Sequence, residues 1–382
     1  PCDMGIEGLW PLLQSSASAY QLKDFNIEHG FIKAPQAPRA LRIGVDARLV
    51  LTFHAADRGM QKRKRQLHTS DTTLTQLQQF LCQLSEAGVD CLFLFDGPGR
   101  PEYKRGKKVI HREPDYYKHA KTLIELFGYS SRTATGDAEA ELANLNKNGI
   151  IDSVLTKDSD VFPFGAECIL LLSASHSKAL SVDVYRSDAI QCSTGISRGG
   201  FLLIALLLPS DVSQGVNGIG SKTAFSLAQC GFGDELLEAY NRFSTAPSLL
   251  SVAFQKLNND MVLELESDSR GKLGSISFTR AQILRDAKFP SLGILSDIEA
   301  FVMPPINPSF VHQFASTLPD IIGLTRFCRE QFGWNSELTI KKFHTDLWPA
   351  VITRMLCSVC TINHLSDSQL LIPHSLSAWC RS

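Results

Sequence analysis

Three short apolar runs in this chain each end in an aspartate, and this pattern constrains the fold more than any other feature. The runs cover residues 41–46, 91–96 and 153–158, and they end in Asp46, Asp96 and Asp158. Strand-like runs alternate with helical stretches up to about residue 170, which predicts an α/β fold with a parallel, doubly wound sheet. Open sheets of this kind bind ligands at the carboxyl ends of their strands. We therefore expect the three carboxylates to lie close together.

Four more acids accompany these runs. Asp160 follows Asp158 at a spacing of two, Asp137 and Glu139 have the same spacing in a predicted helix start, and Asp211 precedes a glycine-rich stretch. A single aspartate after a strand is more often a turn residue or helix cap than a ligand. Seven converging carboxylates would repel one another without cations, and hard oxygen ligands favour Mg²⁺ or Mn²⁺. The set predicts two divalent ions, an arrangement suited to phosphodiester hydrolysis.

A basic cluster directly follows the Asp96 turn. We expect a basic helix here whose cations lie near a scissile phosphate, although a solvated surface helix is the plain alternative. A second cluster at residues 61–65 leaves three interpretations open: a nuclear localisation signal, a DNA-contacting loop or an exposed insertion. The members of the first cluster are Arg100, Lys104, Arg105, Lys107, Lys108 and Arg112.

Three glycines and a lysine, Gly215, Gly218, Gly220 and Lys222, separate an apolar helix expected over residues 201–208 from a helix expected from Thr223. This spacing predicts a tight hairpin whose bare backbone and helix N-terminus can approach a phosphate diester. Such contacts hold duplex DNA without reading its sequence.

Six motifs in this order resemble those of the XPG-type structure-specific 5′ nucleases, and most of all those of the fungal Holliday junction resolvase branch. The likeness spans residues 4 to about 224, and residues 318–356 look like the helical extension of that branch. The motifs are residues 4–13, 44–47, 95–97, 136–140, 156–160 and 215–224.

The resemblance implies a PIN-like nuclease core, a helix–two-turn–helix element with K⁺ as an implied ligand, and two Mg²⁺ ions that Mn²⁺ can replace. The family's metal carboxylates carry over to Asp46, Asp96, Asp137, Glu139, Asp158, Asp160 and Asp211. Asp137 replaces a usual Glu, and the residues around Asp211 differ from the family's usual Gly-Gly-Asp-Tyr. Lys104 resembles the catalytic lysine, and Gly5 resembles a glycine near the active site.

The implied function is a Mg²⁺-dependent endonuclease that cuts branched double-stranded DNA, Holliday junctions or 5′ flaps, in DNA repair and recombination. Two alternatives remain open: a 5′-flap endonuclease of the same superfamily, and a catalytically impaired DNA-junction binding protein. The sequence also leaves open whether a homodimer acts on four-way junctions. The residues expected to contact DNA are Gly5, Arg100, Arg105, Lys107, Lys108, Gly215, Gly218, Gly220 and Lys222.

The composition is consistent with this interpretation. A net charge of −1 over 382 residues means that DNA binding must depend on local basic patches. We expect a nuclease core over residues 4–305 with the helix–two-turn–helix element at about 211–235, a helical extension over 306–358, and an unassigned, aperiodic tail over 359–382. No apolar run is long enough to span a bilayer, and the ten cysteines show no disulfide framework. Nuclear residence is what the family implies.

Overall fold

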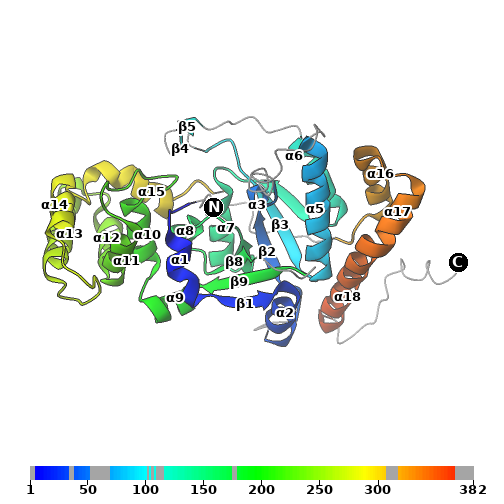
Figure 1. Ribbon diagram of the computed structural model, residues 1–382, viewed down its shortest axis with the longest axis horizontal. Helices are drawn as coiled ribbons and strands as arrows, with labels where there is room; N and C mark the ends of the chain where they lie inside the picture. Colours follow the sequence, from blue (N-terminus) through cyan, green and yellow to red (C-terminus); the bar gives the residue numbers. More distant parts are fainter. Residues whose placement is uncertain are drawn as a thin grey trace.

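A seven-stranded sheet forms the centre of the computed structural model, which describes residues 5–33, 38–51, 69–100, 103–104, 107–108, 116–173, 179–306 and 317–365. Its strand order is β1-β9-β8-β7-β2-β3-β6 (Figure 1). The strands are β1 (Ser18–Gln21), β2 (Arg42–Asp46), β3 (Asp90–Phe95), β6 (Ser130–Thr133), β7 (Ser153–Leu155), β8 (Cys168–Leu172) and β9 (Ser181–Arg186).

The predicted parallel sheet is present in its central part. β6, β3, β2, β7 and β8 run parallel to their neighbours. The parallel pairing stops at one edge, where β9 pairs antiparallel with both β8 and β1. β9 follows β8 in the chain, in a stretch of mixed polar and apolar residues. The buried Val182 and Val184 alternate with the half-exposed Asp183 and give this segment the period of a strand.

Side chains of β3 alternate between two hydrophobic cores, one on each face of the sheet. Leu92 and Leu94 join the core that contains α7 (Ala138–Lys147) and α10 (Arg198–Leu207). Phe93 and Phe95 join the opposite core, which contains α5 (Thr69–Glu86) and α6 (Tyr116–Leu126). The remaining helices on or near the sheet are α1 (Leu9–Leu13), α2 (Leu22–Asn26), α3 (Ala47–Leu51), α8 (Val161–Phe164) and α9 (Ser187–Thr194).

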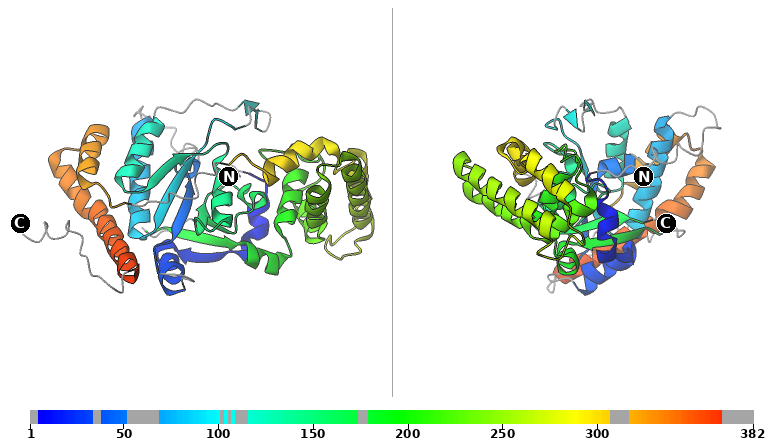
Figure 2. Two further views of the ribbon diagram at one scale, coloured as in Figure 1. Left: turned by 180° about the vertical axis from the view of Figure 1, so that it is seen from behind. Right: turned by 60° about the vertical axis from the view of Figure 1, so that its left-hand side comes forward.

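A bundle of helices stands at one end of the sheet, coloured green to yellow in Figures 1 and 2. It consists of α10, α11 (Ser221–Gln229), α12 (Phe232–Phe243), α13 (Pro247–Ser267), α14 (Phe278–Ala287) and α15 (Leu295–Val302). α10 is buried along nearly its whole length, because its apolar residues face the bundle on one side and the sheet on the other. The predicted apolar helix over residues 201–208 and the following helix at residue 223 are therefore confirmed as α10 and α11.

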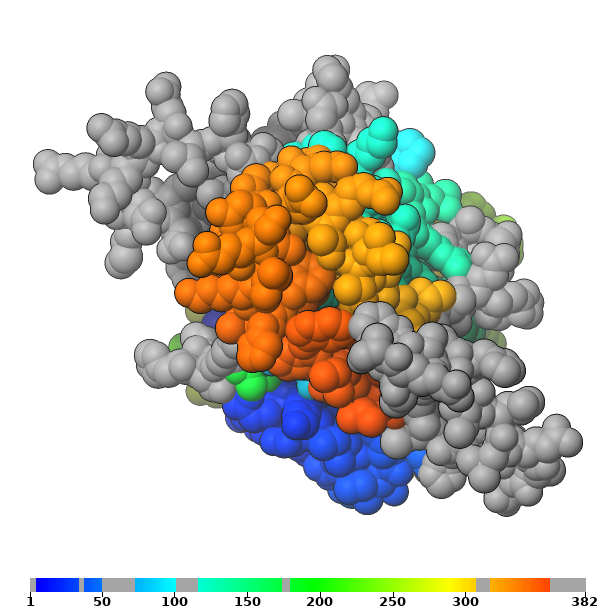
Figure 3. All heavy atoms as spheres, turned by 90° about the vertical axis from the view of Figure 1, so that its right-hand side faces the viewer, coloured from blue at the N-terminus to red at the C-terminus, as the bar shows by residue number. Residues whose placement is uncertain are grey.

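The predicted helical extension forms α16 (Ile321–Phe332), α17 (Ser336–Lys342) and α18 (Trp348–Leu365) at the other end of the molecule (Figure 3). α18 packs along α5, and Leu324, Phe343 and Leu347 belong to the same core as the strands. The expectation of an aperiodic chain from residue 359 is wrong, since α18 continues to Leu365.

Residues 103–108 also differ from the prediction of a basic helix. β4 (Tyr103–Lys104) and β5 (Lys107–Lys108) pair antiparallel as a short hairpin. The side chains of both strands lie outside the described residues.

Two expectations from composition can be compared with the described residues. Seven cysteines are described, and all have free thiols. No single described helix is both long and apolar enough to cross a membrane, although α9 and α10 meet the length and composition test together as a bent pair.

Candidate metal centre

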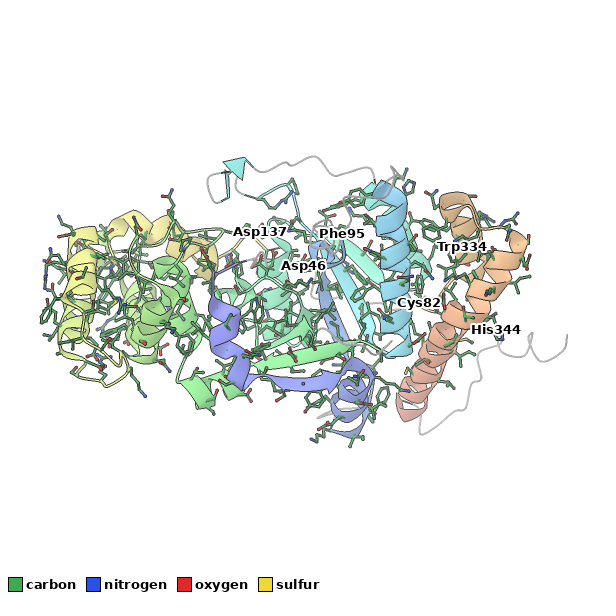
Figure 4. All side chains as sticks on the ribbon, viewed as in Figure 1. Asp46, Cys82, Phe95, Asp137, Trp334 and His344 are labelled. Carbon is green, nitrogen blue, oxygen red and sulfur yellow. The ribbon has the colours of Figure 1, made fainter. Side chains whose placement is uncertain are left out.

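The carboxyl ends of β2, β3 and β7 bring the predicted acids to one edge of the sheet. β2 lies between β3 and β7 and runs parallel to both, with Asp46 at its last position opposite Leu94. Asp96 follows β3 directly, and Asp158 follows β7 by three residues. Figure 4 shows Asp46 and Asp137 at this same edge of the sheet, one from β2 and the other from the start of α7. The expected convergence of acids from separate segments is therefore present.

Asp96, Asp137 and Glu139 form the tightest group of acids, which we call the acidic triad. One carboxylate oxygen from each lies within 4.8 Å of the other two. Two backbone hydrogen bonds between the loops, Gly97 N to Gly136 O at 2.8 Å and Gly99 N to Thr135 O at 2.9 Å, hold the Asp96 turn against the start of α7. The Asp96 carboxylate also accepts a 3.1 Å hydrogen bond from Ala138 N, at the positive end of the α7 dipole.

A second group of acids lies on the β2–β7 side of the edge. Thr156 donates to Asp46 Oδ2 at 3.2 Å, and its hydroxyl accepts from Asp158 N at 3.0 Å. Asp160 N donates to Asp158 Oδ1 at 3.0 Å. These bonds make a tight turn that orders the pair of aspartates, and Asp46, Asp158 and Asp160 are all buried. Thr156 thus supports the site, a role that the sequence alone did not indicate.

Arg48 is the main residue of the site that the sequence analysis missed. Its Nε lies 3.0 Å from Asp96 Oδ2, and a terminal nitrogen lies 3.8 Å from Glu139 Oε1. Arg100, which was predicted to contact DNA, donates to the same Asp96 oxygen at 3.0 Å and to Gly97 O at 3.1 Å. The sequence carries no local signal for this role of Arg48, because its place between two acids depends on how separate segments meet.

Burial dominates the electrostatics of the buried acids. It raises the pKa of Asp46 to about 7, with the Arg48 cation opposing this rise and the charges of Asp96 and Asp158 adding to it. The pKa of Glu139 is raised well above its usual value, first by burial and against the same Arg48 cation. Glu139 Oε1 is buried and accepts no hydrogen bond from the described residues. The group of acids thus holds negative charge that the described protein only partly neutralises.

Glu141, also in the first turn of α7, is not a member of the acidic triad. It is buried, and its Oε2 accepts a 3.1 Å hydrogen bond from Thr135 N. This bond fixes the loop that leads into the acidic triad, so Glu141 contributes to the position of the site.

The beginning of the chain packs against the aspartate turn. Ile6 N donates to Ser159 Oγ at 2.7 Å, and Trp10 Nε1 donates to Lys157 O at 3.0 Å. Gly5 has a φ of +80°, and a Cβ there would come within 2.3 Å of Asp158 Oδ1. Its glycine identity is therefore required by both the backbone conformation and the space beside Asp158.

Asp211 and the glycine hairpin lie in the loop between α10 and α11. Asp211 is half-buried in a turn in which Ser210 Oγ accepts from Ser213 N at 2.9 Å. Gly215 has a φ of +71°, and a Cβ there would lie 2.6 Å from the Leu208 carbonyl carbon, so the hairpin closes tightly. Gly220 caps α11, a Cβ on it would meet no atom within 4 Å, and Lys222 is exposed. That Asp211 joins the other acids stays a prediction.

Several predicted site residues cannot be placed by their side chains. Lys104, Lys107 and Lys108 lie on the β4–β5 hairpin, whose side chains are outside the described residues, and Arg105 and Arg112 lie outside them altogether. Residues 61–65 are also outside the described part of the chain.

Comparison with known proteins agrees with this geometry. The XPG I-region matches residues 128–211, which contain the acidic residues from Asp137 to Asp211. DNA repair protein RAD2 of Saccharomyces cerevisiae is 29% identical over 224 residues, or 58% of this chain and 20% of RAD2. Human Flap endonuclease GEN homolog 1 is 34% identical over 134 residues, or 34% of this chain and 15% of that protein. The chain thus spans a fifth or less of the length of these two relatives.

The fold matches solved structures over most of the chain. The crystal structure of the Holliday junction-resolving enzyme GEN1 with product DNA and Mg²⁺ superposes with a TM-score of 0.70 and 24% identity, covering 93% of this chain and 80% of that one. A structure of eukaryotic junction-resolving enzyme GEN-1 with potassium gives 0.69 and 25%, with the same coverage. The chain thus contains an XPG I-region, and its sequence and its fold are similar to those of the XPG-type structure-specific nucleases.

Proposed function

We propose that this protein is a metal-dependent, structure-selective DNA endonuclease that hydrolyses phosphodiester bonds in branched DNA. One observation carries the proposal: Asp46, Asp96, Glu139 and Asp158 come from four separate segments, and the charges of Asp96 and Asp158 are close enough to raise the pKa of both Asp46 and Glu139. A fold gains nothing in stability from concentrating like charges at one edge, so such a site is typical of function.

The residues present fit divalent cations. All the donors are carboxylate oxygens, which Mg²⁺ and Mn²⁺ prefer over softer ligands. The buried Glu139 Oε1 accepts no hydrogen bond from the described residues, and the acidic triad has the spacing that a shared ion needs. Asp96, Asp137 and Glu139 would hold one ion, and Asp46, Asp158, Asp160 and Asp211 are the remaining proposed ligands. When bound, two such ions polarise a water and stabilise the attacking and leaving oxygens of the phosphate.

The residues of the chain itself have distinct proposed roles around these ions. Thr156 and the turn at residues 158–160 keep Asp46 and Asp158 in place, so the ligands need little rearrangement. Lys104 is the proposed cation that stabilises the charge developing on the phosphate, since it belongs to the hairpin that follows the Asp96 turn. Arg100 is proposed to contact the DNA backbone near the same turn.

The glycine hairpin between α10 and α11 is the proposed grip on duplex DNA. Its tight closure and the amide groups at the start of α11 suit a phosphate backbone, and Lys222 is exposed beside them. K⁺ is the proposed ligand of this helix–two-turn–helix element; one structural relative, GEN-1, has been solved with potassium.

The substrate class follows from the relatives. Their names describe Holliday junction resolution, flap endonuclease activity and DNA repair. We infer that branched double-stranded DNA is the partner, Holliday junctions or 5′ flaps the substrates, and the nucleus the site of action. A homodimer on four-way junctions is part of this proposal. The core is proposed to span residues 4–305, with an extension over 306–358.

One observation favours a second candidate. Arg48 occupies space among the acids that would bind the ions, as expected of a junction-binding protein with impaired catalysis.

Cleavage assays distinguish the two candidates. Labelled four-way junctions, 5′ flaps and splayed arms are incubated with the wild type, Asp46→Ala and Asp158→Ala, in Mg²⁺ and then in EDTA. The endonuclease proposal expects cleavage by the wild type alone, DNA binding by all three proteins, and no product in EDTA. Binding without cleavage by the wild type at any Mg²⁺ or Mn²⁺ concentration would establish the second candidate instead.

A further inference from the structure

Arg48 and the acidic triad share the same space. The guanidinium reaches two of the three acids, with Nε 3.0 Å from Asp96 Oδ2 and a terminal nitrogen 3.8 Å from Glu139 Oε1. Glu139 is the largest electrostatic partner of Arg48, followed among the acids by Asp96, Asp46 and Asp158. The side chain is 24% exposed, so most of it lies within the site.

The backbone fixes where this side chain begins. Asp46 Oδ1 accepts a 2.8 Å hydrogen bond from Arg48 N, which starts α3 directly after β2. The Arg48 side chain therefore leaves from beside one proposed ligand and ends between two others. An arginine stays protonated under all ordinary conditions, so its positive charge is permanent.

A guanidinium and a divalent ion cannot use these oxygens together. A metal ion binds carboxylate oxygens at about 2.0–2.2 Å, and the Arg48 guanidinium occupies this space beside Asp96. The positive charges of the ion and of Arg48 would also repel one another. We propose that Arg48 competes with a divalent ion for the acidic triad, so that this ion binds only when the guanidinium moves away. The inference rests on the proposed metal-dependent function of the same acids.

The chemistry of arginine suggests what moves it. A guanidinium pairs with phosphate oxygens through two parallel hydrogen bonds, at least as well as with a carboxylate. The backbone phosphate of a bound DNA strand would give Arg48 a new partner and free the acidic triad for the ion. Metal loading would then depend on the presence of DNA, and a protein without DNA would hold one ion weakly.

Mn²⁺ binding without DNA tests the competition directly. Bound and free Mn²⁺ are measured by electron paramagnetic resonance for the wild type, Arg48→Met and Arg100→Met. Both variants lose a cation 3.0 Å from the same Asp96 oxygen, and Arg48 also forms an ion pair with Glu139. We expect Arg48→Met to bind its weaker Mn²⁺ about tenfold more tightly than the wild type, because a like charge is removed from the site. Arg100→Met should change the affinity less than about threefold, since Arg100 divides its hydrogen bonds between Asp96 and the Gly97 carbonyl.

Two further measurements make the result decisive. Arg48→Lys keeps a positive charge and should remain near the wild-type affinity. Thermal unfolding with and without Mn²⁺ checks that each variant folds, and Arg48→Gln replaces Arg48→Met if the latter is unfolded without metal. Equal Mn²⁺ affinities for the wild type and the folded neutral variant would overturn the proposal, as would an equal gain in Arg100→Met. Tighter Mn²⁺ binding by Arg48→Met, together with a wild type that binds but never cuts DNA, would support the competition and refute the endonuclease function, so the two failures are distinguishable.

Discussion

The backbone amide of Ile6 donates a 2.7 Å hydrogen bond to the hydroxyl of Ser159, a residue 153 positions further along the chain. The bond ties the first described loop to the turn that carries Asp158 and Asp160. Because Gly5 precedes this contact and touches the same turn, the geometry of two proposed metal ligands depends on a residue outside the sheet.

Replacing Gly5 with alanine should therefore impair the site far more than it impairs folding. The new methyl group would lie 2.3 Å from Asp158 Oδ1 and would displace that carboxylate. We expect a loss of cleavage of tenfold or more, measured on labelled junctions. Gly195→Ala is the matched control, because Gly195 has a φ of +77° but no atom within 4 Å of the added carbon. Gly195→Ala should cost about 1 kcal/mol of stability and leave cleavage unchanged. Similar losses of cleavage in both variants would show that Gly5→Ala does not act through Asp158.

The metal-free protein should lose stability as the pH rises from about 4 to about 7. Burial raises the folded-state pKa of Asp46 from 3.8 to about 7, so the folded protein holds this proton more tightly than the unfolded chain does. The advantage is present at low pH and disappears as the pH passes through the folded-state value. Urea unfolding in EDTA should show that the stability of Asp46→Asn falls less across this pH range than that of the wild type. At pH 7.5 the variant should be more stable than the wild type by on the order of 2 kcal/mol. If the stability of the wild type and of Asp46→Asn changed equally with pH, Asp46 would not be the source of this pH dependence.

Arg354 should be a major source of stability for the C-terminal helices. Its guanidinium is buried in the second core, where it donates to Phe127 O and Thr317 O at 3.1 Å each and lies 4.0 Å from the centre of the Tyr129 ring. Arg354→Met leaves these carbonyls without this donor and should cost about 3 kcal/mol in urea unfolding. Arg285→Met removes a 2.8 Å ion pair with Glu266 whose arginine is 48% exposed, and it should cost less than about 1 kcal/mol. If Arg354→Met and Arg285→Met lost the same stability, burial of the guanidinium would not explain the contribution of Arg354.

Lys222 should contribute one phosphate contact to DNA binding. Lys222→Ala is expected to weaken binding of a four-way junction, and to reduce the slope of log affinity against log salt by about 1, measured by fluorescence anisotropy. Lys256→Ala, an equally exposed lysine on α13, serves as the charge-matched control and should change neither quantity. If both variants behave alike, the contribution is net charge and not the hairpin.

The sequence predicted the acids of the site well for a simple reason. β2, β3 and β7 are parallel neighbours, so any residue just after their last apolar position must reach the same edge. The local spacing of Asp137 and Glu139 likewise placed both at the start of a helix. Patterns of this kind depend only on strand direction and helix period, which the chain itself specifies.

Other features could not be predicted because they depend on which segments meet. The position of Arg48 between Asp96 and Glu139 requires the β2, β3 and α7 segments to be assembled first. The direction of β9 depends on its pairing with β1, a strand from the beginning of the chain that the sequence analysis did not identify.

The packing of α16–α18 determines how shortened forms of this protein would behave. Leu324, Phe343 and Leu347 fill the same core as Leu77 and Phe80 of α5, so a product ending before residue 317 would leave those α5 side chains in water. Cellular proteases remove chains with such exposed surfaces. We therefore expect a product that ends in this region to be degraded and not to accumulate.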